Sequence, residues 1–288
     1  MTTLDAVLTM LRCPVCAAPL ERTDRTVRCT GGHSFDVARQ GYLNLAVGRR
    51  ADTADSAAMV GAREAFLARG HYDAVADALA AAVAATVATT VSAGESDAGR
   101  VVDLAGGTGF YLARVLRADA VGVLLDLSVP ALRRAARAHP RAAAVGADAW
   151  QPLPLVDGVA DVVLSVFGPR DPAEVERVLR PGGRLVVVAP RPGHLAELVG
   201  PLGLVAVDPR KDERAAASFA RFERGDQRLL TYPARFTRDD AHAVAAMGPS
   251  ARHVTDAELR SRVDALPEAL DVTVDVTVTT YVRPPARP

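Results

Sequence analysis

The stretch VVDLAGGTG at residues 101–109 decides the fold class of this chain of 288 residues. Its apolar first half followed by a glycine-rich turn is typical of a buried strand that leads into a helix. Glycines let the backbone approach a ligand closely and adopt dihedral angles that other residues resist. Because a glycine-rich turn alone does not identify a ligand, the surrounding sequence has to show what the turn holds.

Downstream of this stretch, apolar runs alternate with helical patterns. We predict strands near 101–105, 121–126, 142–147, 160–166 and 184–189, and helices near 109–118, 128–139, 171–180 and 193–203. Such alternation indicates βαβ units and a parallel sheet covered on both faces. Near the end, valines at 272, 274, 276 and 278 alternate with more polar residues and predict one late strand, suited to an edge or antiparallel position. The expected fold is α/β, a Rossmann-like and mostly parallel sheet with one late antiparallel strand.

Upstream, two further regions precede this domain. Residues 1–48 hold all the cysteines and many turn formers and predict a small separate module. Residues 49–98 predict a helical connector, with a helical pattern over 52–93 that Gly70 interrupts and a polar loop at its end. The main domain is then expected over residues 99–288.

Within residues 1–48, the three cysteines and one histidine follow the spacing C-x2-C-x12-C-x3-H. Zinc prefers four thiolate or imidazole ligands at tetrahedral corners, and paired knuckles of this kind supply them. All four positions are filled, so the pattern favours a closed, structural zinc site over a catalytic one. The alternative is three unrelated cysteines in a reduced protein. The predicted ligands are Cys13, Cys16, Cys29 and His33.

Composition narrows the class of protein. Basic and acidic residues balance at 34 each, which argues against a generic nucleic-acid coat protein. Hydrophobic residues make up 49% of the chain, the weakly apolar run at 78–93 is shorter than a membrane span, and the first residues lack a secretory signal. We therefore expect no membrane association and a cytoplasmic location. With only three cysteines and no export signal, we do not expect a disulfide framework.

The next strand supplies a second cofactor signal. Asp126 ends it, at about the distance along the chain expected for a carboxylate that binds ribose hydroxyls. The turn itself lacks the G-x-G-x-x-G spacing of pyrophosphate sites and resembles the first motif of class I methyltransferases, although Ala105 stands where that motif usually begins with glycine. The resemblance implies S-adenosylmethionine as cofactor, with Asp148 bonded to the adenine amino group. Turn capping is the alternative role for Asp103 and Asp148, and a core position is the alternative for Trp150. The predicted cofactor residues are Asp103, Ala105, Gly106, Gly107, Gly109, Asp126, Asp148 and Trp150.

The stretches at residues 11–16, 29–45 and 55–72 resemble the large-subunit (23S) ribosomal RNA guanine-N1 methyltransferases. The resemblance runs nearly the full length and is closest to the actinobacterial branch that protects against tylosin-like macrolides. It implies that the zinc module helps to bind a 23S rRNA hairpin and that a guanine is methylated on N1. Gly248 departs from the threonine of many members, near the expected acceptor pocket. Candidate phosphate contacts are Arg39, Arg49 and Arg50, each of which has a solvated side chain as its alternative.

Removal of the guanine N1 proton requires a catalytic base or a water path, and the sequence identifies no single residue as that base. His194 is a candidate on the acceptor side, with a structural hydrogen bond as the alternative. Phe167 is a candidate for stacking on an unpaired base, with core packing as the alternative. Two rival functions also stay open, namely a small-molecule methyltransferase that tailors a natural product and a catalytically inactive RNA-binding adaptor. Whether two copies pair as a homodimer is not determined by the sequence.

Overall fold

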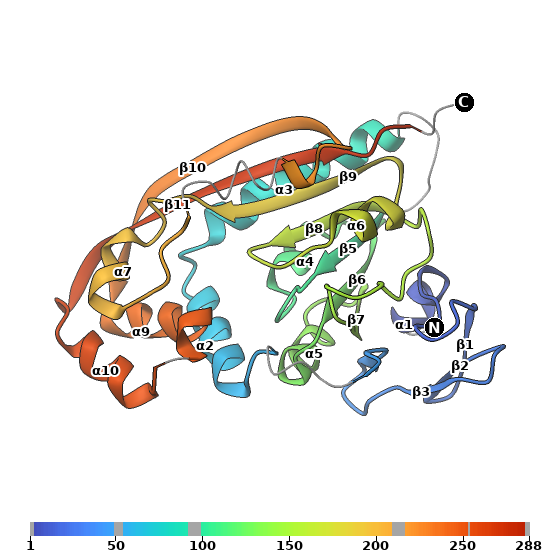
Figure 1. Cartoon of the computed structure of the whole chain (residues 1–288), viewed down its shortest axis with the longest axis horizontal. Helices are drawn as coiled ribbons and strands as arrows, with labels where there is room; N and C mark the ends of the chain where they lie inside the picture. Colours follow the sequence, from blue (N-terminus) through green and yellow to red (C-terminus); the bar gives the residue numbers. More distant parts are fainter. Residues whose placement is uncertain (1–2, 49–53, 92–98, 209–216, 253, 286–288) are drawn as a thin grey trace.

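The computed structural model describes residues 3–48, 54–91, 99–208, 217–252 and 254–285. Its central feature is an eight-stranded sheet in the order β10-β11-β9-β8-β5-β6-β7-β4 (Figure 1). The strands of this sheet are β4 (Leu43–Asn44), β5 (Arg100–Leu104), β6 (Val121–Asp126), β7 (Ala142–Gly146), β8 (Ala160–Val166), β9 (Leu179–Pro190), β10 (Glu223–Thr237) and β11 (Ala269–Val282).

The parallel half of this sheet confirms the predicted βαβ units. Strands β4 to β9 pair in parallel, and β5 lies between β6 and β8. The predicted strand positions agree with the structure to within a residue or two, except that β9 begins five residues earlier, at Leu179. The order of the strands reverses beside β5, and ligands of open α/β sheets bind at such a reversal.

The helices that join and cover the strands begin at residues whose side chains cap them. Ser56, Ser128 and Asp171 each accept a hydrogen bond from a backbone N–H in the first turn of the following helix. Thr237 and Thr255 form complete capping boxes. The helices are α1 (Thr3–Val7), α2 (Ala57–Ala68), α3 (Asp73–Val91), α4 (Phe110–Val115), α5 (Val129–Ala135), α6 (Pro172–Val178), α7 (Ala196–Leu202), α9 (Arg238–Ala246) and α10 (Asp256–Asp264).

The antiparallel end of the sheet is larger than the sequence predicted. The predicted late strand is present as β11, but it lies between β9 and β10 and not at an edge, and residues 274–281 are buried on both of its faces. A second antiparallel strand, β10, pairs along its length and forms the edge. Charged residues such as Arg224 and Asp226 broke the apolar pattern of β10, because most of this strand is exposed.

Each face of the sheet has its own core. One face packs against α2, α3, α4, α5 and α9, with Phe66, Leu112 and Phe236 fully buried. The other face packs against α6 and the N-terminal module, whose Leu11, Leu43 and Leu45 are buried beside Val102 and Val145. The module thus covers apolar strand residues that would otherwise face water.

The module has a small antiparallel sheet of its own, formed by β1 (Leu20–Thr23), β2 (Thr26–Cys29) and β3 (Ser34–Asp36). A short 3-10 helix at Leu8–Met10 precedes it, and a second one at Pro249–Arg252 follows α9. Strand β4 then leaves the module and extends the central sheet beside β7. Among the described residues, no helix is long and apolar enough to cross a membrane.

Candidate functional site

The predicted zinc ligands come together at one point of the N-terminal module. The ligand atoms of Cys13, Cys16, Cys29 and His33 all lie within 4.8 Å of one another. The Cys16 and Cys29 Sγ atoms are 3.6 Å apart, which is far longer than a disulfide of about 2.05 Å. Nδ1 of His33 lies 3.6 Å from Cys13 Sγ and 3.4 Å from Cys29 Sγ.

These separations fit a tetrahedral zinc ion. With zinc bonds of about 2.3 Å to sulfur and about 2.0–2.1 Å to nitrogen, tetrahedral edges are about 3.8 Å for S–S and about 3.5 Å for S–N. The turn is tight at Gly31, where a Cβ would lie 3.0 Å from Cys16 Sγ. The chain's donor set therefore suits a closed zinc site that holds the module together.

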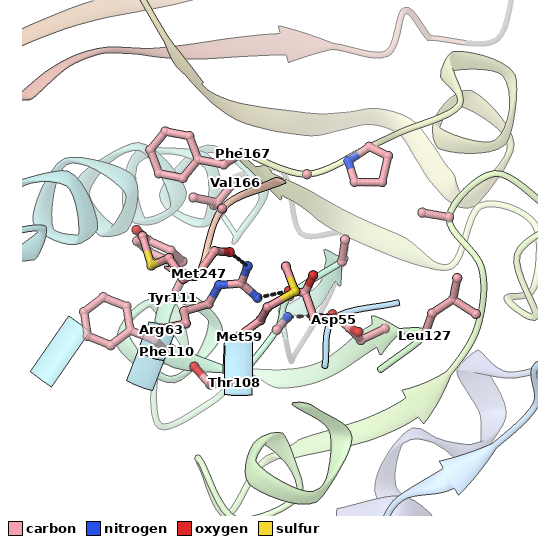
Figure 2. Close-up of a pocket in the computed structure, with 18 of the residues that line it drawn as sticks. Asp55, Met59, Arg63, Thr108, Phe110, Tyr111, Leu127, Val166, Phe167 and Met247 are labelled. Atoms are coloured by element: carbon pink, nitrogen blue, oxygen red, sulfur yellow. Dashed lines mark hydrogen bonds and ion pairs between the residues drawn. The ribbon is translucent and has the colours of Figure 1, made fainter. Parts of the chain in front are cut away.

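A cavity of about 520 Å³ opens at the carboxyl ends of the parallel strands. The turns after β5, β6 and β8 line it together with α2 and the end of α9, and Figure 2 shows Arg63 of α2 next to Met247. Seven of the eight predicted cofactor residues line it, namely Asp103, Ala105, Gly106, Gly107, Asp126, Asp148 and Trp150. A cavity at this edge of a doubly wound sheet is where a nucleotide-like ligand is expected.

Asp103 presents a buried carboxyl group at the floor of the cavity. Its side chain is 1% exposed, and Oδ2 has no hydrogen-bond partner among the described residues. Burial, with a contribution from the charge of Asp126, raises the pKa of this carboxyl to about 8. A buried carboxyl oxygen with no partner in the protein can receive an ammonium group from a ligand, as the methionine part of S-adenosylmethionine would supply.

The glycine turn passes directly over this carboxyl group. A Cβ at Gly106 would lie 2.5 Å from Asp103 Oδ2 and 2.6 Å from Leu124 Cδ1, so no other residue fits there. Ala105 has a φ of 52°, a left-handed conformation that favours glycine. This accounts for the glycine that methyltransferase motifs usually have at this position, and alanine accepts the same conformation here at some cost in strain.

Asp126 stands at the end of β6 on the other side of the turn. Its Oδ2 accepts a hydrogen bond of 2.9 Å from the Gly107 N–H, and its Oδ1 accepts one of 2.7 Å from the Ser128 N–H. Burial raises the pKa of this carboxyl above its ordinary value, and the two backbone donors oppose that rise. The carboxylate is held in one orientation at the position from which the sequence predicted contact with ribose hydroxyls.

The remaining predicted cofactor residues divide into two groups. Asp148 accepts a hydrogen bond of 2.9 Å from the Trp150 N–H, and the Trp150 side chain is 65% exposed at the cavity rim, so it is not a core tryptophan. Gly109, in contrast, packs away from the cavity at the start of α4. A Cβ there would lie 2.8 Å from the Ala138 Cβ, so this glycine serves the packing of α4.

Phe167 and His194 meet on the side of the cavity formed by β8 and β9. Their rings stack at 5.8 Å with an angle of 24°, and Phe167 is 39% exposed with a φ of 54°. His194 Nδ1 accepts a hydrogen bond from the Asp275 N–H, and Nε2 lies 2.9 Å from the Tyr72 hydroxyl. Both ring nitrogens of His194 are thus engaged within the protein. This agrees with the alternative role given for His194, a structural hydrogen bond.

A charged cluster above the glycine turn is not indicated by any sequence pattern. Arg63 on α2 forms an ion pair of 2.6 Å with Asp55 and donates to the carbonyl oxygen of Met247 (Figure 2). Arg252 also pairs with Asp55 at 3.2 Å. A Cβ on Gly107 would lie 3.3 Å from Arg63 Nη1, so the cluster rests on the cofactor turn. Its members are up to 197 residues apart, and no local pattern connects them.

Of the predicted phosphate contacts, Arg39 lies on the N-terminal module. Arg39 is exposed. Arg49 and Arg50 lie outside the described residues.

Comparison with known proteins identifies both parts of the chain. A family model described as the N-terminal part of RlmA, a zinc ribbon, matches residues 11–46, and one described as a methyltransferase domain matches residues 101–183. A 23S rRNA (guanine(748)-N(1))-methyltransferase of Streptomyces fradiae is 50% identical over 95% of this chain and 96% of its own length. Two proteins named putative 23S rRNA (guanine-N(1)-)-methyltransferases are similar over comparable lengths, one of Micromonospora griseorubida at 49% identity and one of Bacillus subtilis at 29%.

Proposed function

Because this chain belongs to the family of 23S rRNA guanine-N1 methyltransferases, we propose that it transfers a methyl group from S-adenosylmethionine to N1 of a guanine in a hairpin loop of 23S rRNA. The observation that carries this proposal is that one chain holds both a cluster of zinc ligands and a methyltransferase cavity. A Cys3His cluster lies in a module that packs on the same sheet whose strand ends form the methyltransferase cavity. Full-length likeness to the Streptomyces fradiae enzyme supports the assignment of the substrate.

The cofactor supplies a methyl group on a positively charged sulfur, which is already a strong electrophile. The protein therefore has to hold that group in line with the attacking nitrogen. We assign Asp103 to the methionine ammonium group, Asp126 to the ribose hydroxyls and Asp148 to the adenine amino group. Trp150, exposed at the rim, covers the adenine ring.

On the acceptor side, the exposed face of Phe167 offers a stacking surface for a guanine that is unpaired in the loop. Its left-handed backbone turns the side chain out of the sheet at the strand end, a feature that a core phenylalanine would not need. His194 holds the other side of this ring and acts in our proposal as a positioning residue. The guanine N1 proton leaves by a water path, since the nitrogens of His194 are both engaged.

The identity of the guanine and the biological role are the finer parts of this proposal. We propose the guanine that corresponds to position 748, which the name of the Streptomyces fradiae relative gives, and a role in resistance to tylosin-like macrolides. Because an enzyme with this substrate works where ribosomes are, we also propose a cytoplasmic location. The homodimer stays a prediction that no contact in the structure tests.

Primer extension on methylated RNA tests this proposal. The purified protein is incubated with unmodified 23S rRNA and S-adenosylmethionine, and the RNA is then copied by reverse transcriptase. Because N1 methylation blocks Watson–Crick pairing, a new stop one nucleotide before the target guanine is expected, and an Asp103→Asn variant should lose it. Cofactor binding without methyl transfer into RNA would favour the small-molecule methyltransferase. Binding of RNA without any cofactor affinity would favour the inactive adaptor.

A further inference from the structure

A basic surface surrounds helix α5, on the flank of the cofactor cavity. Between Asp126 and Asp148 the chain has four arginines and one histidine and no acidic residue. Three of these arginines are exposed, and their side chains form no ion pair or hydrogen bond with any residue in the described part of the chain: Arg133, Arg137 and Arg141. An unpaired arginine keeps its full charge and all of its donors available for a partner.

The zinc module adds its own arginine to this surface. The loop between β3 and β4 reaches the end of α5, where a Cβ on Gly41 would lie 3.9 Å from the Ala136 Cβ. On the same side, the Thr3 hydroxyl donates to the carbonyl oxygen of Pro140 at 2.7 Å. Arg39 is exposed in that loop, two residues before Gly41, and has no ion pair with a described residue. We call Arg39, Arg133, Arg137 and Arg141 together the α5 surface.

A groove of about 480 Å³ lies between α2, α4 and α5 and starts at this surface. Arg137 lines it, together with two arginines that are held in ion pairs, Arg134 with Glu64 and Arg114 with Asp73, both at 2.8 Å. The guanidinium of Arg114 also stacks on the Phe110 ring at 3.8 Å. The groove shares three wall residues with the cofactor cavity, namely Leu67, Thr108 and Phe110.

We propose that the α5 surface binds the phosphate backbone of the rRNA beside the target nucleotide, and that the groove directs this strand from the zinc module to the cavity. The proposal rests on the proposed function, because it assigns a binding path to that substrate. Arginine binds phosphate oxygens through two parallel hydrogen bonds, and such contacts fix the register of a nucleic acid without reading its sequence.

The balance of charge over the whole chain supports this assignment. Basic and acidic residues are equal in number, so the net charge gives no overall attraction to polyanions. A local excess of positive charge on one flank therefore gives the approach of RNA a direction. The position of the excess also suits the substrate. Helix α5 lies between α2 and the N-terminal module (Figure 1), and the groove beside it shares wall residues with the cofactor cavity.

A charge-neutralising double variant tests the proposal. Arg133→Gln with Arg137→Gln removes two charges from exposed positions, one in the last turn of α5 and one in the turn that follows it, and glutamine is a good helix former at the first of these. The matched control is Arg224→Gln with Arg228→Gln, on the exposed face of β10 at the opposite edge of the sheet. The Kd for a fragment of unmodified 23S rRNA that contains the target hairpin is measured from about 50 to 200 mM KCl, together with the KM for RNA, the affinity for S-adenosylmethionine and the thermal midpoint.

We expect the α5 double variant to bind RNA about tenfold or more weakly at low salt and to lose about 1.4–2 from the slope of log Kd against log salt. The affinity for S-adenosylmethionine, the thermal midpoint and the stopping position of reverse transcriptase should not change, and the β10 control should behave as the wild type. An unchanged slope and KM in the α5 variant, or an equal loss in the control, would overturn the inference. Failure of the proposed function looks different, because the wild type itself would then give no reverse-transcriptase stop.

Discussion

The Tyr72 hydroxyl lies 2.9 Å from Nε2 of His194. The Asp275 N–H donates to Nδ1 of the same ring, at 3.2 Å, so the neutral imidazole carries its proton on Nε2 and donates it to the Tyr72 oxygen. Burial raises the pKa of Tyr72, which keeps its hydroxyl protonated. The two side chains form one hydrogen-bonded unit, in which His194 donates to Tyr72. The Tyr72 hydroxyl keeps its own proton, at the wall of the cavity.

This unit makes His194 a positioning residue and not the base. Replacement of His194 by Gln should lower kcat/KM about tenfold, the effect of losing a hydrogen bond of about 1.4 kcal/mol. The pH dependence of the rate should stay as in the wild type, because no proton from the guanine passes through the imidazole. Rates measured from pH 6 to 9 check this. If the variant lost the acidic limb of the profile, His194 would be the base after all.

Cofactor binding should depend on pH through Asp103. The free protein holds this carboxyl protonated below its raised pKa of about 8, whereas an ion pair with the methionine ammonium group needs the carboxylate. Binding therefore releases a proton below pH 8, and the affinity should rise about tenfold per pH unit up to that point and then level off. Isothermal titration in buffers of different ionisation enthalpy measures both the affinity and the released proton.

The Asp103→Asn variant provides the control for this dependence. It should bind S-adenosylmethionine more weakly at pH 8 and show no slope between pH 6.5 and 8. In the wild-type protein without cofactor, the contribution of Asp103 to stability should fall as the pH rises, whereas the affinity for the cofactor rises. Between about pH 4 and 8 the folded wild type binds one more proton than the unfolded chain at Asp103, so this group's contribution to stability falls as pH rises. A wild-type affinity that does not vary with pH would contradict the assigned role of Asp103.

The glycine turn should not tolerate a side chain at Gly106. An alanine there would place its Cβ 2.5 Å from Asp103 Oδ2, so we expect Gly106→Ala to abolish cofactor binding. Gly61→Ala on α2 is the matched control, since nothing lies within 4 Å of a Cβ at that position. This control should stabilise the protein by about 0.5–1 kcal/mol, because alanine favours a helix over glycine. Thermal shifts with and without S-adenosylmethionine compare the two variants.

Removal of zinc should destabilise the whole protein and not only the first 48 residues. The module contributes Leu11, Leu43 and Leu45 to the core on one face of the sheet, so its loss exposes that face to water. We expect a Cys29→Ser variant, or chelation, to cost more than about 4 kcal/mol and lower the thermal midpoint by about 10 °C. Calorimetry with measured zinc content checks this. Two separate transitions, with the later one unshifted, would contradict it.

Trp150 is the single tryptophan of the chain, which makes its contact with the cofactor directly measurable. Its ring is 65% exposed, so Trp150→Ala should leave the thermal midpoint nearly unchanged. The variant should lose about tenfold in affinity for S-adenosylmethionine if the ring covers adenine. In the wild type the intrinsic fluorescence should change on cofactor binding. An unchanged fluorescence and an unchanged affinity would remove Trp150 from the cofactor site.

Local patterns predicted the parallel strands, the break at Gly70, the zinc ligands and the cofactor turn. Each depends on residues that are close in sequence, such as the glycines after β5 or the two pairs of metal ligands. Strand β10 escaped prediction because its exposed face carries charged residues, so its pattern does not mark burial. The cluster of Asp55, Arg63 and Arg252 escaped because only the tertiary fold brings these side chains together.

The same fold explains two features that residue patterns do not predict. Residues 274–281 of β11 are buried on both faces because other parts of the chain pack on each face. Val274, Val276 and Val278 belong to one core and Tyr281 to the other, and Thr277 and Thr279 are buried as well. The stacking position of Phe167 depends on a left-handed backbone that no residue-type preference indicates for phenylalanine. Both features follow from neighbours far away in the chain.

The two edges of the central sheet resist the addition of another strand. One edge is β4, only two residues long, and such a short strand offers few free backbone groups. The other edge is β10, which carries Pro233, an irregular register between Arg224 and Gln227 and several exposed charges. These features protect a long exposed strand from edge-to-edge aggregation. If two copies of this enzyme associate, the contact will therefore be made by side chains and not by a sheet continued from one molecule into the next.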